Sequence, residues 1–258
     1  MISQINSMRQ SVSLSNILWL ETRNEILKTF RMPAFVIPSL IFPVMFYVFF
    51  GVLFNQSGAD GNMSHYLIAT YGVFGIMGPA LFSFGVGVAV EKDQGWFAVK
   101  RCSPMPISAY FISRILTSMI FGLIIVLELF IIGAVFGDVV LTRSQWILTL
   151  VSLLLGTLPF CVLGLWIGLT IKGQAAPAIV NLIYLPMAFL SGLWIPLGVF
   201  PEFMQNVAWI FPAFHLSQMV LSIQGLSLGF DLIWHLLSLV TMSAIAWLLA
   251  ARAFNKHA

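Results

Sequence analysis

Six long apolar runs with almost no charge divide this chain and limit what it can fold into. They cover about residues 33–54, 67–90, 115–136, 147–171, 175–194 and 230–250. A helix of about 22 residues is about 33 Å long, so it can cross a hydrocarbon layer of about 30 Å. Backbone amides cannot stay unpaired in lipid, and the runs lack the alternation of a membrane barrel. We therefore predict an all-α membrane protein with six transmembrane helices.

The overall composition excludes a soluble globular protein. Hydrophobic residues make up 60% of the chain and charged residues only 8%, a balance typical of integral membrane proteins. The net charge of +3 suits contact with anionic membrane lipid. No basic patch interleaved with aromatic residues lies outside the apolar runs, so we expect no nucleic-acid partner.

The basic residues are sorted between the two sides of the predicted membrane. If the segments between the runs alternate sides, one side receives every Lys and Arg of the 12 except Arg143. Positive residues accumulate on the cytoplasmic side of membrane proteins. This distribution predicts that both the N-terminus and the C-terminus are cytoplasmic.

The N-terminal segment 1–32 precedes the six-span domain, residues 33–258, and contains a predicted amphipathic helix over residues 14–31. Five apolar side chains share one face of this helix: Trp19, Leu20, Ile26, Leu27 and Phe30. The opposite face carries Glu21, Asn24, Glu25, Lys28 and Thr29. Such a helix would lie in the inner membrane interface. The alternative is an ordinary helix packed on the protein.

The segment 195–229 is apolar but is interrupted by Pro196, Pro201 and Pro212. Proline disrupts helices, so no stretch there is long enough to cross a membrane comfortably. We predict a broken helical hairpin that enters the outer leaflet before the sixth span. His215 and Gln218 are expected to be structural polar groups near the outer surface, and Asp231 and His235 an i, i+4 pair at its edge.

A charged cluster follows the second run. Glu91, Lys92 and Asp93 should extend the second span into the cytosol, and Gly95 would allow a sharp turn. The side chains that follow, Trp96, Phe97 and Val99, could form an apolar knob ringed by charges, which suits docking to a soluble partner. The alternative is a solvated loop that anchors the membrane edge.

Two stretches carry a family resemblance. The segment 91–106 has Glu at the inner end of the second span, then Gly, basic residues and a Pro-Met-Pro stop, and residues 185–216 combine Pro186, Ser191–Gly192, Pro196, Pro201 and Pro212. With six spans and an amphipathic N-terminus, this order resembles the type 2 exporter permeases of the ATP-binding-cassette (ABC) superfamily. The Gly-Trp-Phe of residues 95–97 departs from the family pattern, in which a smaller residue precedes Leu-like positions.

The resemblance implies an assembly and a role for the charged segments. Two cytoplasmic ATPase subunits would bind the permease, which would pair with a second copy or a paralogue. The segment 91–106 would act as a cytoplasmic coupling helix: Trp96 and Phe97 would fill a groove on the ATPase, while Glu91 and Asp93 would pair with basic groups. The N-terminal helix, with Glu21, Glu25 and Lys28, would brace it. The location would be a bacterial inner membrane.

The chain lacks the sequence features of an ATPase. No phosphate-binding Gly-x-x-x-x-Gly-Lys-Ser/Thr loop occurs, and there is not even a Gly-Lys pair. ATP and Mg²⁺ would therefore bind to the partner ATPase, and we predict no cofactor, no catalytic residue and no enzyme activity on this chain. The four His residues are scattered without the spacing of metal ligands, so we predict no metal site.

The substrate pathway would involve the first and fifth spans if the resemblance holds. Five candidate pathway residues lie there: Phe42, Phe46, Asn181, Tyr184 and Met187. Glu128 is an acid well inside a span, where a charge is costly. It could contact substrate, or it could be a protonated side chain bonded to a neighbouring helix. The expected cargo is amphipathic or hydrophobic: a drug, antibiotic, lipid or glycan-linked molecule that is exported.

Two other functions compete with this interpretation. Ser191 and His235 could form the dyad of an intramembrane serine protease, but Phe189 occupies the position where Gly-x-Ser-Gly needs its first glycine. A secondary transporter or a channel would also have several spans. The sequence contains no carbonyl-filter motif and no evident inverted repeat of broken helices.

Overall fold

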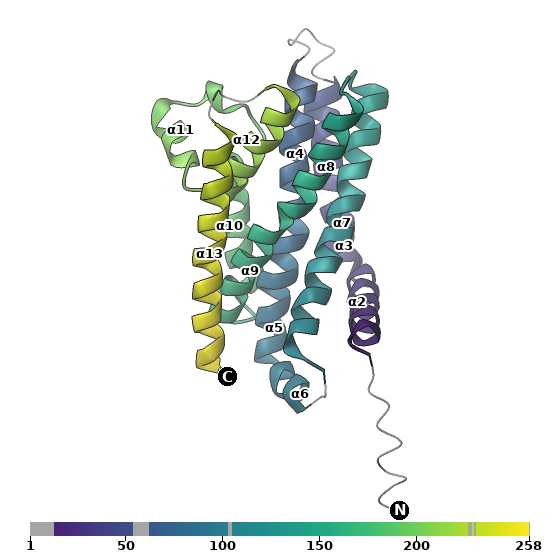
Figure 1. Cartoon of the computed structure of the whole chain (residues 1–258), viewed down its shortest axis with the longest axis vertical. Helices are drawn as coiled ribbons and strands as arrows, with labels where there is room; N and C mark the ends of the chain where they lie inside the picture. Colours follow the sequence, from purple (N-terminus) through teal and green to yellow (C-terminus); the bar gives the residue numbers. More distant parts are fainter. Residues whose placement is uncertain (1–12, 54–61, 103–104, 227–228, 230, 258) are drawn as a thin grey trace, which may run out of the picture.

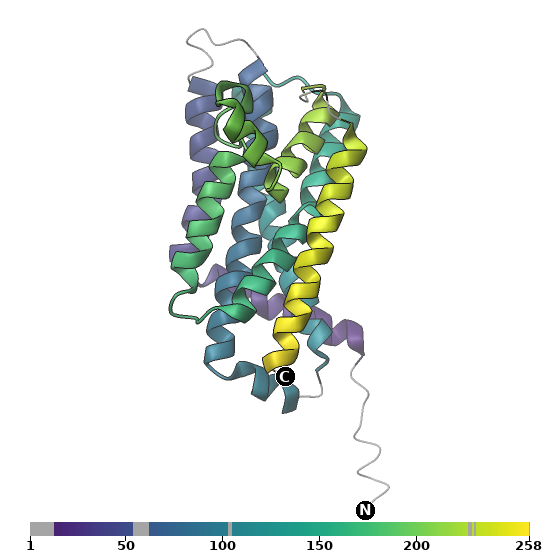
Figure 2. The same ribbon diagram turned by 90° about the vertical axis from the view of Figure 1, so that its left-hand side faces the viewer.

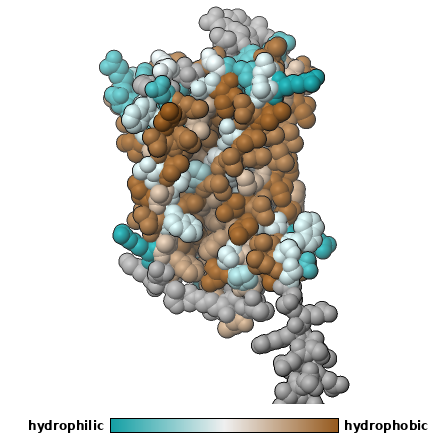
Figure 3. All heavy atoms as spheres, in the orientation of Figure 1, coloured by the Kyte–Doolittle hydropathy of each residue, from teal (hydrophilic) through white to brown (hydrophobic). Residues whose placement is uncertain are grey.

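The computed structural model describes residues 13–53, 62–102, 105–226, 229 and 231–257. Within these ranges every element of regular secondary structure is a helix, so the prediction of an all-α membrane protein is confirmed. The helices run side by side in an elongated bundle (Figure 1). On the face that Figure 3 shows, a broad apolar belt covers the middle of the bundle, and the most hydrophilic residues lie toward its two ends.

Among the described residues, five helical segments are long and apolar enough to cross a membrane. They are Pro33–Leu53, Met63–Asp93, Ile107–Phe136, Arg143–Thr170 and Leu232–Phe254. Helix α10 (Ala176–Leu190) is apolar but has only 15 residues, fewer than the roughly 20 of a typical span. Helices α11 (Glu202–Ala208) and α12 (Pro212–Gln224) meet at 93°, as expected for the predicted broken hairpin. The candidate spans therefore number five, or six if this bent pair counts as one.

Proline explains why two of the spans change helix type along their length. The first consists of α3 (Pro33–Phe46) and the π-helical η1 (Tyr47–Leu53), and the second of α4 (Asn62–Leu81), the π-helical η3 (Phe82–Val86) and α5 (Gly87–Asp93). Pro43 and Pro79 lie just before the two π-helical segments. Proline lacks an N–H and its ring clashes with the preceding turn, so the regular hydrogen-bond ladder is already interrupted there.

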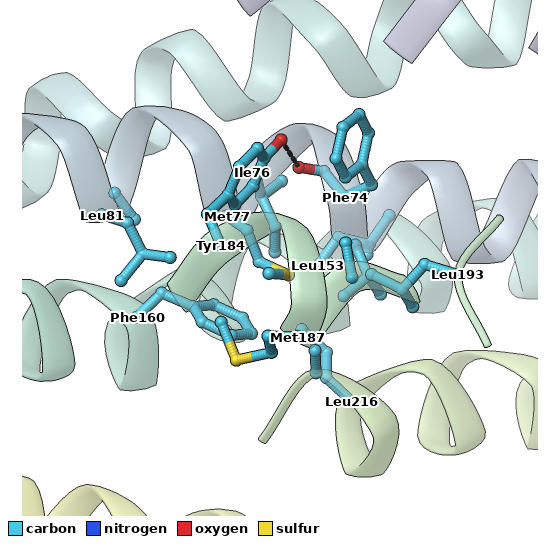
Figure 4. Close-up of a cluster of buried hydrophobic side chains, with 14 of the residues drawn as sticks. Phe74, Ile76, Met77, Leu81, Leu153, Phe160, Tyr184, Met187, Leu193 and Leu216 are labelled. Carbon is cyan, nitrogen blue, oxygen red and sulfur yellow. Dashed lines mark hydrogen bonds between the residues drawn. The ribbon is translucent and has the colours of Figure 1, made fainter. Parts of the chain in front are cut away.

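The second span forms the centre of the bundle. In its most apolar stretch 72% of the residues are buried, whereas the corresponding share is 17–39% in the other four candidate spans. Tyr184 of α10 donates a 3.2 Å hydrogen bond to the carbonyl of Phe74 in α4, among closely packed apolar side chains (Figure 4). Gly168 allows α9 (Thr157–Thr170) to approach η3, because a Cβ there would lie 2.5 Å from the Phe84 carbonyl oxygen. Close packing through small residues is common in membrane helices.

The two ends of the bundle differ. Helix α2 (Leu14–Phe30), the short α6 (Trp96–Cys102) and the C-terminus lie at one end, which we call the α6 end, and α11 and α12 lie at the other (Figures 1 and 2). The remaining long helices are α7 (Ile107–Phe136), α8 (Arg143–Leu155) and α13 (Leu232–His257), and the 3-10 turn η4 is Leu197–Val199.

Helix α2 lies across the bundle axis in Figure 2 and packs on α7. Its polar face is turned toward the protein: Thr22, Glu25 and Thr29 are buried. Its apolar face is open, with Trp19 68% and Leu20 50% exposed. The predicted helix over residues 14–31 is thus present. The polar face turns inward because Glu25 forms an ion pair with the buried Arg114 of α7.

Candidate functional site

The second span ends at the α6 end in a sharp turn. Helix α5 stops at Asp93, and Gly95 has a positive φ of 76°, a left-handed conformation that glycine adopts without strain. Helix α6 starts at the next residue, Trp96. The predicted turn at Gly95 is therefore present, and it directs α6 away from the direction of the span. Pro104, in the predicted Pro-Met-Pro stop, lies outside the described residues.

Helix α6 has one exposed apolar face and one packed face. Trp96 is 48% and Val99 is 61% exposed, and residues three apart share a face of a helix. Phe97 points the other way, with its ring centroid 6.0 Å from that of Tyr110 and 6.3 Å from that of Phe254. Of the predicted apolar knob, Trp96 and Val99 are open to a partner, while Phe97 connects α6 to α7 and α13.

Glu91, at the end of the second span, is the centre of a charge cluster. Its Oε1 lies 2.5 Å from Nη2 of Arg114 and 2.5 Å from Nζ of Lys28. The hydroxyl of Tyr110 donates to Oε2 at 2.7 Å. The side chain of Arg114 is only 1% exposed. Charge-assisted bonds of this kind are stronger than neutral ones, so Glu91 connects α2, α5 and α7.

Glu25 of α2 completes the cluster. Its carboxylate lies 3.2 Å from Nη2 of Arg114 and 3.6 Å from Nζ of Lys28. Nη1 of Arg114 donates to the carbonyl of Ser83. Two acids face two bases, so the buried charges compensate one another, which a buried ion pair needs in order to be tolerated. Of the predicted bracing residues, Lys28 therefore contacts Glu91 directly, and Glu25 shares the cations Arg114 and Lys28 with Glu91. Glu21 is half-buried elsewhere on the same helix.

Sequence reasoning did not single out Arg114, because it was placed just before the third span. Helix α7 in fact starts at Ile107, so Arg114 lies about two turns inside it. An ionisable residue within an apolar helix needs a partner. An extension of the third helix toward its N-terminus would therefore have marked Arg114 as a residue with a partner. The partner itself could not be identified, since Glu91 is 23 positions away.

Lys92 and Asp93 bind backbone groups at the end of the fourth span. Nζ of Lys92 donates to the carbonyls of Ile171 at 2.7 Å and Leu169 at 2.9 Å, and a cation at a helix C-terminus stabilises the unpaired carbonyls. Oδ2 of Asp93 accepts the backbone N–H of Gly173 at 2.7 Å. Glu91, Lys92 and Asp93 lie just before α6, at what we call its base. Glu91 binds α2 and α7, while Lys92 and Asp93 bind the end of α9 and Gly173.

A pocket of about 640 Å³ opens beside this cluster. It lies between α2, the start of α3, the end of the second span and α7. The lining residues are Glu25, Lys28, Thr29, Met32, Phe35, Phe82, Ser83, Val86, Gly87, Val90, Glu91, Gln94, Trp96 and Arg114. Ligand pockets commonly have volumes of about 300–1,000 Å³, so this one is large enough for a small molecule or part of a lipid.

The candidate pathway residues are not gathered in one open site. Phe42 is 50% exposed, and Asn181 is also exposed. Phe46 is half-buried and stacks with Tyr71 and Trp194, whereas Tyr184 and Met187 lie in the packed core (Figure 4). Glu128 is half-buried on α7. Their role in transport stays a prediction.

The residues of the alternative serine dyad are not hydrogen-bonded to each other. Ser191 Oγ is buried without a hydrogen-bond partner in the described part of the chain. His235 Nδ1 lies 3.0 Å from Nδ1 of the buried His215, a pairing that the sequence did not suggest. No group of three or more His, Cys, Asp or Glu side chains within the described ranges could hold a metal ion.

The comparisons with known proteins agree with the architecture. The sequence profile described as "ABC-2 type transporter" matches residues 17–225. The chain is also similar to a protein of Bacillus subtilis (strain 168) that carries the name "Putative transport permease YvfS". The two are 32% identical over 202 residues, which cover 78% of this chain and 82% of the relative. A match over most of the chain, from the N-terminal helix to the end of α12, identifies this protein as a membrane-spanning subunit of the ABC-2 type transporter family.

Proposed function

We propose that this permease subunit exports an amphipathic or hydrophobic molecule, with energy from ATP hydrolysed on two separate ATPase subunits. The α6 end would face the cytoplasm of a bacterial cell, with both termini inside, as the sorting of the basic residues predicts. A second copy of the chain or a paralogue would complete the pathway. ATP and Mg²⁺ would bind to the ATPase subunits.

The observation that carries this proposal is the attachment of α6. Its outer face offers Trp96 and Val99, while Phe97 packs against Tyr110 and Phe254. The residues just before it bind Lys28, Arg114 and the end of α9. A force that a partner applies to α6 would therefore reach α7 and α13 through Phe97, and α2, α7 and α9 through residues 91–93 at the start of the turn.

Exposed apolar faces on α3 and α10 support pairing with a second permease. Phe42 and Phe49 of the first span are about half exposed, and Leu182 of α10 is 73% exposed. These side chains would contact lipid in a single copy and protein in a pair. Crosslinks between copies through α3 or α10 would support this arrangement, whereas crosslinks through α7 alone would contradict it.

Docking through α6 can be tested with the double variant W96A/V99A. The permease would be coexpressed with the candidate ABC ATPases of its own organism and purified from detergent. Burial of two such side chains contributes about 1.5–3 kcal/mol each before ordering costs, so we expect at least about a tenfold loss of copurified ATPase. V140A, which truncates an 84% exposed side chain outside α6, is the matched control.

Two results would contradict the proposal. If W96A/V99A left both ATPase recovery and the coupling of hydrolysis to transport unchanged, α6 would not be a docking site but a solvated segment. Transport that continues without any ATPase subunit would favour the secondary transporter or channel.

The orientation can be tested separately with thiol reagents. Cys102 on α6 is exposed, and Cys161 is buried and serves as an internal control. In intact cells an impermeant reagent should label an added cysteine in the variant N206C, on α11, but not Cys102. Permeabilised cells should label both positions. The reverse pattern would place the α6 end outside.

A further inference from the structure

The pocket beside the charge cluster has an apolar wall arranged like a groove for a hydrocarbon chain. Phe82, Val86 and Val90 are all half-buried and lie four residues apart along the second span, so they form one stripe on one face. Met32, just before the first span, and Phe35, in its first turn, also line the pocket. The rings of Phe35 and Phe82 lie 6.1 Å apart.

The polar end of the same pocket offers both signs of charge. Lys28 is the accessible cation, with 47% of its side chain exposed. Glu25 is the carboxylate with the longer ionic contacts, 3.2 and 3.6 Å, whereas Glu91 has two contacts of 2.5 Å. A ligand headgroup would therefore meet an ammonium and a carboxylate next to each other, with no excess of either sign.

Helix α2 places this pocket at the level of a membrane interface. Its exposed apolar residues include Trp19, Leu20, Leu27 and Phe30, the pattern of a helix that lies in the headgroup region. Two of the pocket's polar residues, Glu25 and Lys28, belong to this helix, and the apolar stripe continues from them toward the middle of the bundle. A lipid has the same arrangement, with its polar headgroup in the interface and its acyl chain toward the middle of the bilayer.

We propose that the pocket binds one phospholipid of the inner leaflet with a phosphoethanolamine headgroup. One acyl chain would lie along Phe82, Val86 and Val90. The phosphate would accept hydrogen bonds from Lys28, and the primary ammonium would donate to Glu25. The lipid would thereby join α2 to the second span beside the base of α6. The assignment to the inner leaflet rests on the proposed orientation of the α6 end.

The headgroup assignment follows from the balance of charge. An anionic headgroup such as phosphatidylglycerol could pair with Lys28 but would leave Glu25 facing a phosphate. Phosphatidylcholine has both signs, but its quaternary ammonium has no N–H to donate. The glycerol hydroxyls of phosphatidylglycerol could donate to Glu25, but they are neutral. Of these three headgroups, ethanolamine alone offers Glu25 a charged N–H donor, which makes the stronger hydrogen bond.

Native mass spectrometry of the full-length permease tests this assignment without nucleotide or ATPase. The delipidated protein would be titrated separately with phosphatidylethanolamine, phosphatidylcholine and phosphatidylglycerol of the same acyl chains. We expect one retained phosphatidylethanolamine per copy, bound at least about tenfold more tightly than either other lipid. V86W, which fills the groove, and K28Q, which removes the cation, should each reduce this binding at least about tenfold. I233W is the matched control, because Ile233 is a 67% exposed residue of α13.

Equal binding of phosphatidylethanolamine to wild type and V86W would overturn the site. Equal binding of phosphatidylcholine, or preferred binding of phosphatidylglycerol, would overturn the headgroup assignment. Because the readout is bound lipid mass, a failed export or docking experiment leaves this result unaffected.

A second measurement on the wild-type protein keeps the test valid if V86W does not fold. Phosphatidylethanolamine with a photoreactive acyl chain should label peptides that contain residues 32–35 and 82–90. Labelling confined to α13 and the other exposed apolar faces would contradict the proposal.

Discussion

Glu91 and Arg114 lie 2.5 Å apart, Oε1 to Nη2, where two adjacent membrane helices approach the α6 end of the bundle. Glu91 also bonds Tyr110 and Lys28, so a single carboxylate holds α2, α5 and α7 at the base of α6. A buried ion pair contributes little net stability compared with apolar packing, but the loss of one partner is expensive. This relationship makes the cluster a sensitive position for mutation.

Replacement of Arg114 by Gln should destabilise the folded protein by about 3–5 kcal/mol, because Glu91 and Glu25 would stay buried without their buried cation. Thermal unfolding in detergent measures the effect. The control R143Q removes an exposed charge at the start of α8 and should change stability by less than about 0.5 kcal/mol. The double variant E91Q/R114Q should recover part of the loss. If it is no more stable than R114Q, the two residues are not energetically paired.

Phe97 and Trp96 are adjacent in sequence but should give opposite phenotypes. F97A removes the ring that contacts Tyr110 and Phe254, so it should lower the unfolding temperature. Its cost should be below the about 3–5 kcal/mol of a fully buried phenylalanine, since Phe97 is half-buried. W96A should leave the unfolding temperature nearly unchanged and reduce ATPase recovery. Equal loss of stability in both variants would show that the two faces of α6 are not distinct.

Substitution of Gly168 by Ala should loosen the contact between α9 and the second span. The added methyl group would lie 2.5 Å from the carbonyl oxygen of Phe84, and overpacking of this kind costs about 1–3 kcal/mol. The comparison is G198A, because a methyl group at Gly198 meets no atom within 4 Å. Hydrogen exchange of α9 should increase in G168A alone. The close approach would be disproved by equal protection in both variants.

The paired rings of His215 and His235 should make the contact between α12 and α13 sensitive to acid. His215 Nε2 lies 3.0 Å from the carbonyl of Trp209, so this nitrogen donates, and Nδ1 of neutral His215 accepts from Nδ1–H of His235. When both rings are protonated, two donors face each other and the bond is lost.

The measurement is thermal unfolding at pH 7.5 and at about pH 5. Wild type should lose more stability on acidification than the double variant H215F/H235F, which has no ring to protonate. H235F alone should cost about 1–3 kcal/mol near neutral pH, because His215 keeps a buried acceptor without its donor. An identical acid response in wild type and the double variant would exclude the pair as its source.

Much of the architecture was determined by the sequence alone. The apolar runs require membrane helices, since lipid offers no partner for backbone amides, and the described helices occupy the predicted runs. Pro33 at the first turn of α3 and the turn at Gly95 also follow local rules. The third span starts at Ile107 rather than near residue 115, because the polar side chains of Tyr110 and Arg114 have a partner in Glu91 of α5.

The pairing between helices was decided only by the tertiary structure. The rotation and the height of each helix place Glu91 beside Arg114, turn Phe97 inward while Trp96 faces outward, and bring His235 to His215 from a different helix. These relationships depend on contacts between residues far apart in the chain. Local periodicity defines which face of a helix is apolar, but it carries no information about which neighbour that face will meet.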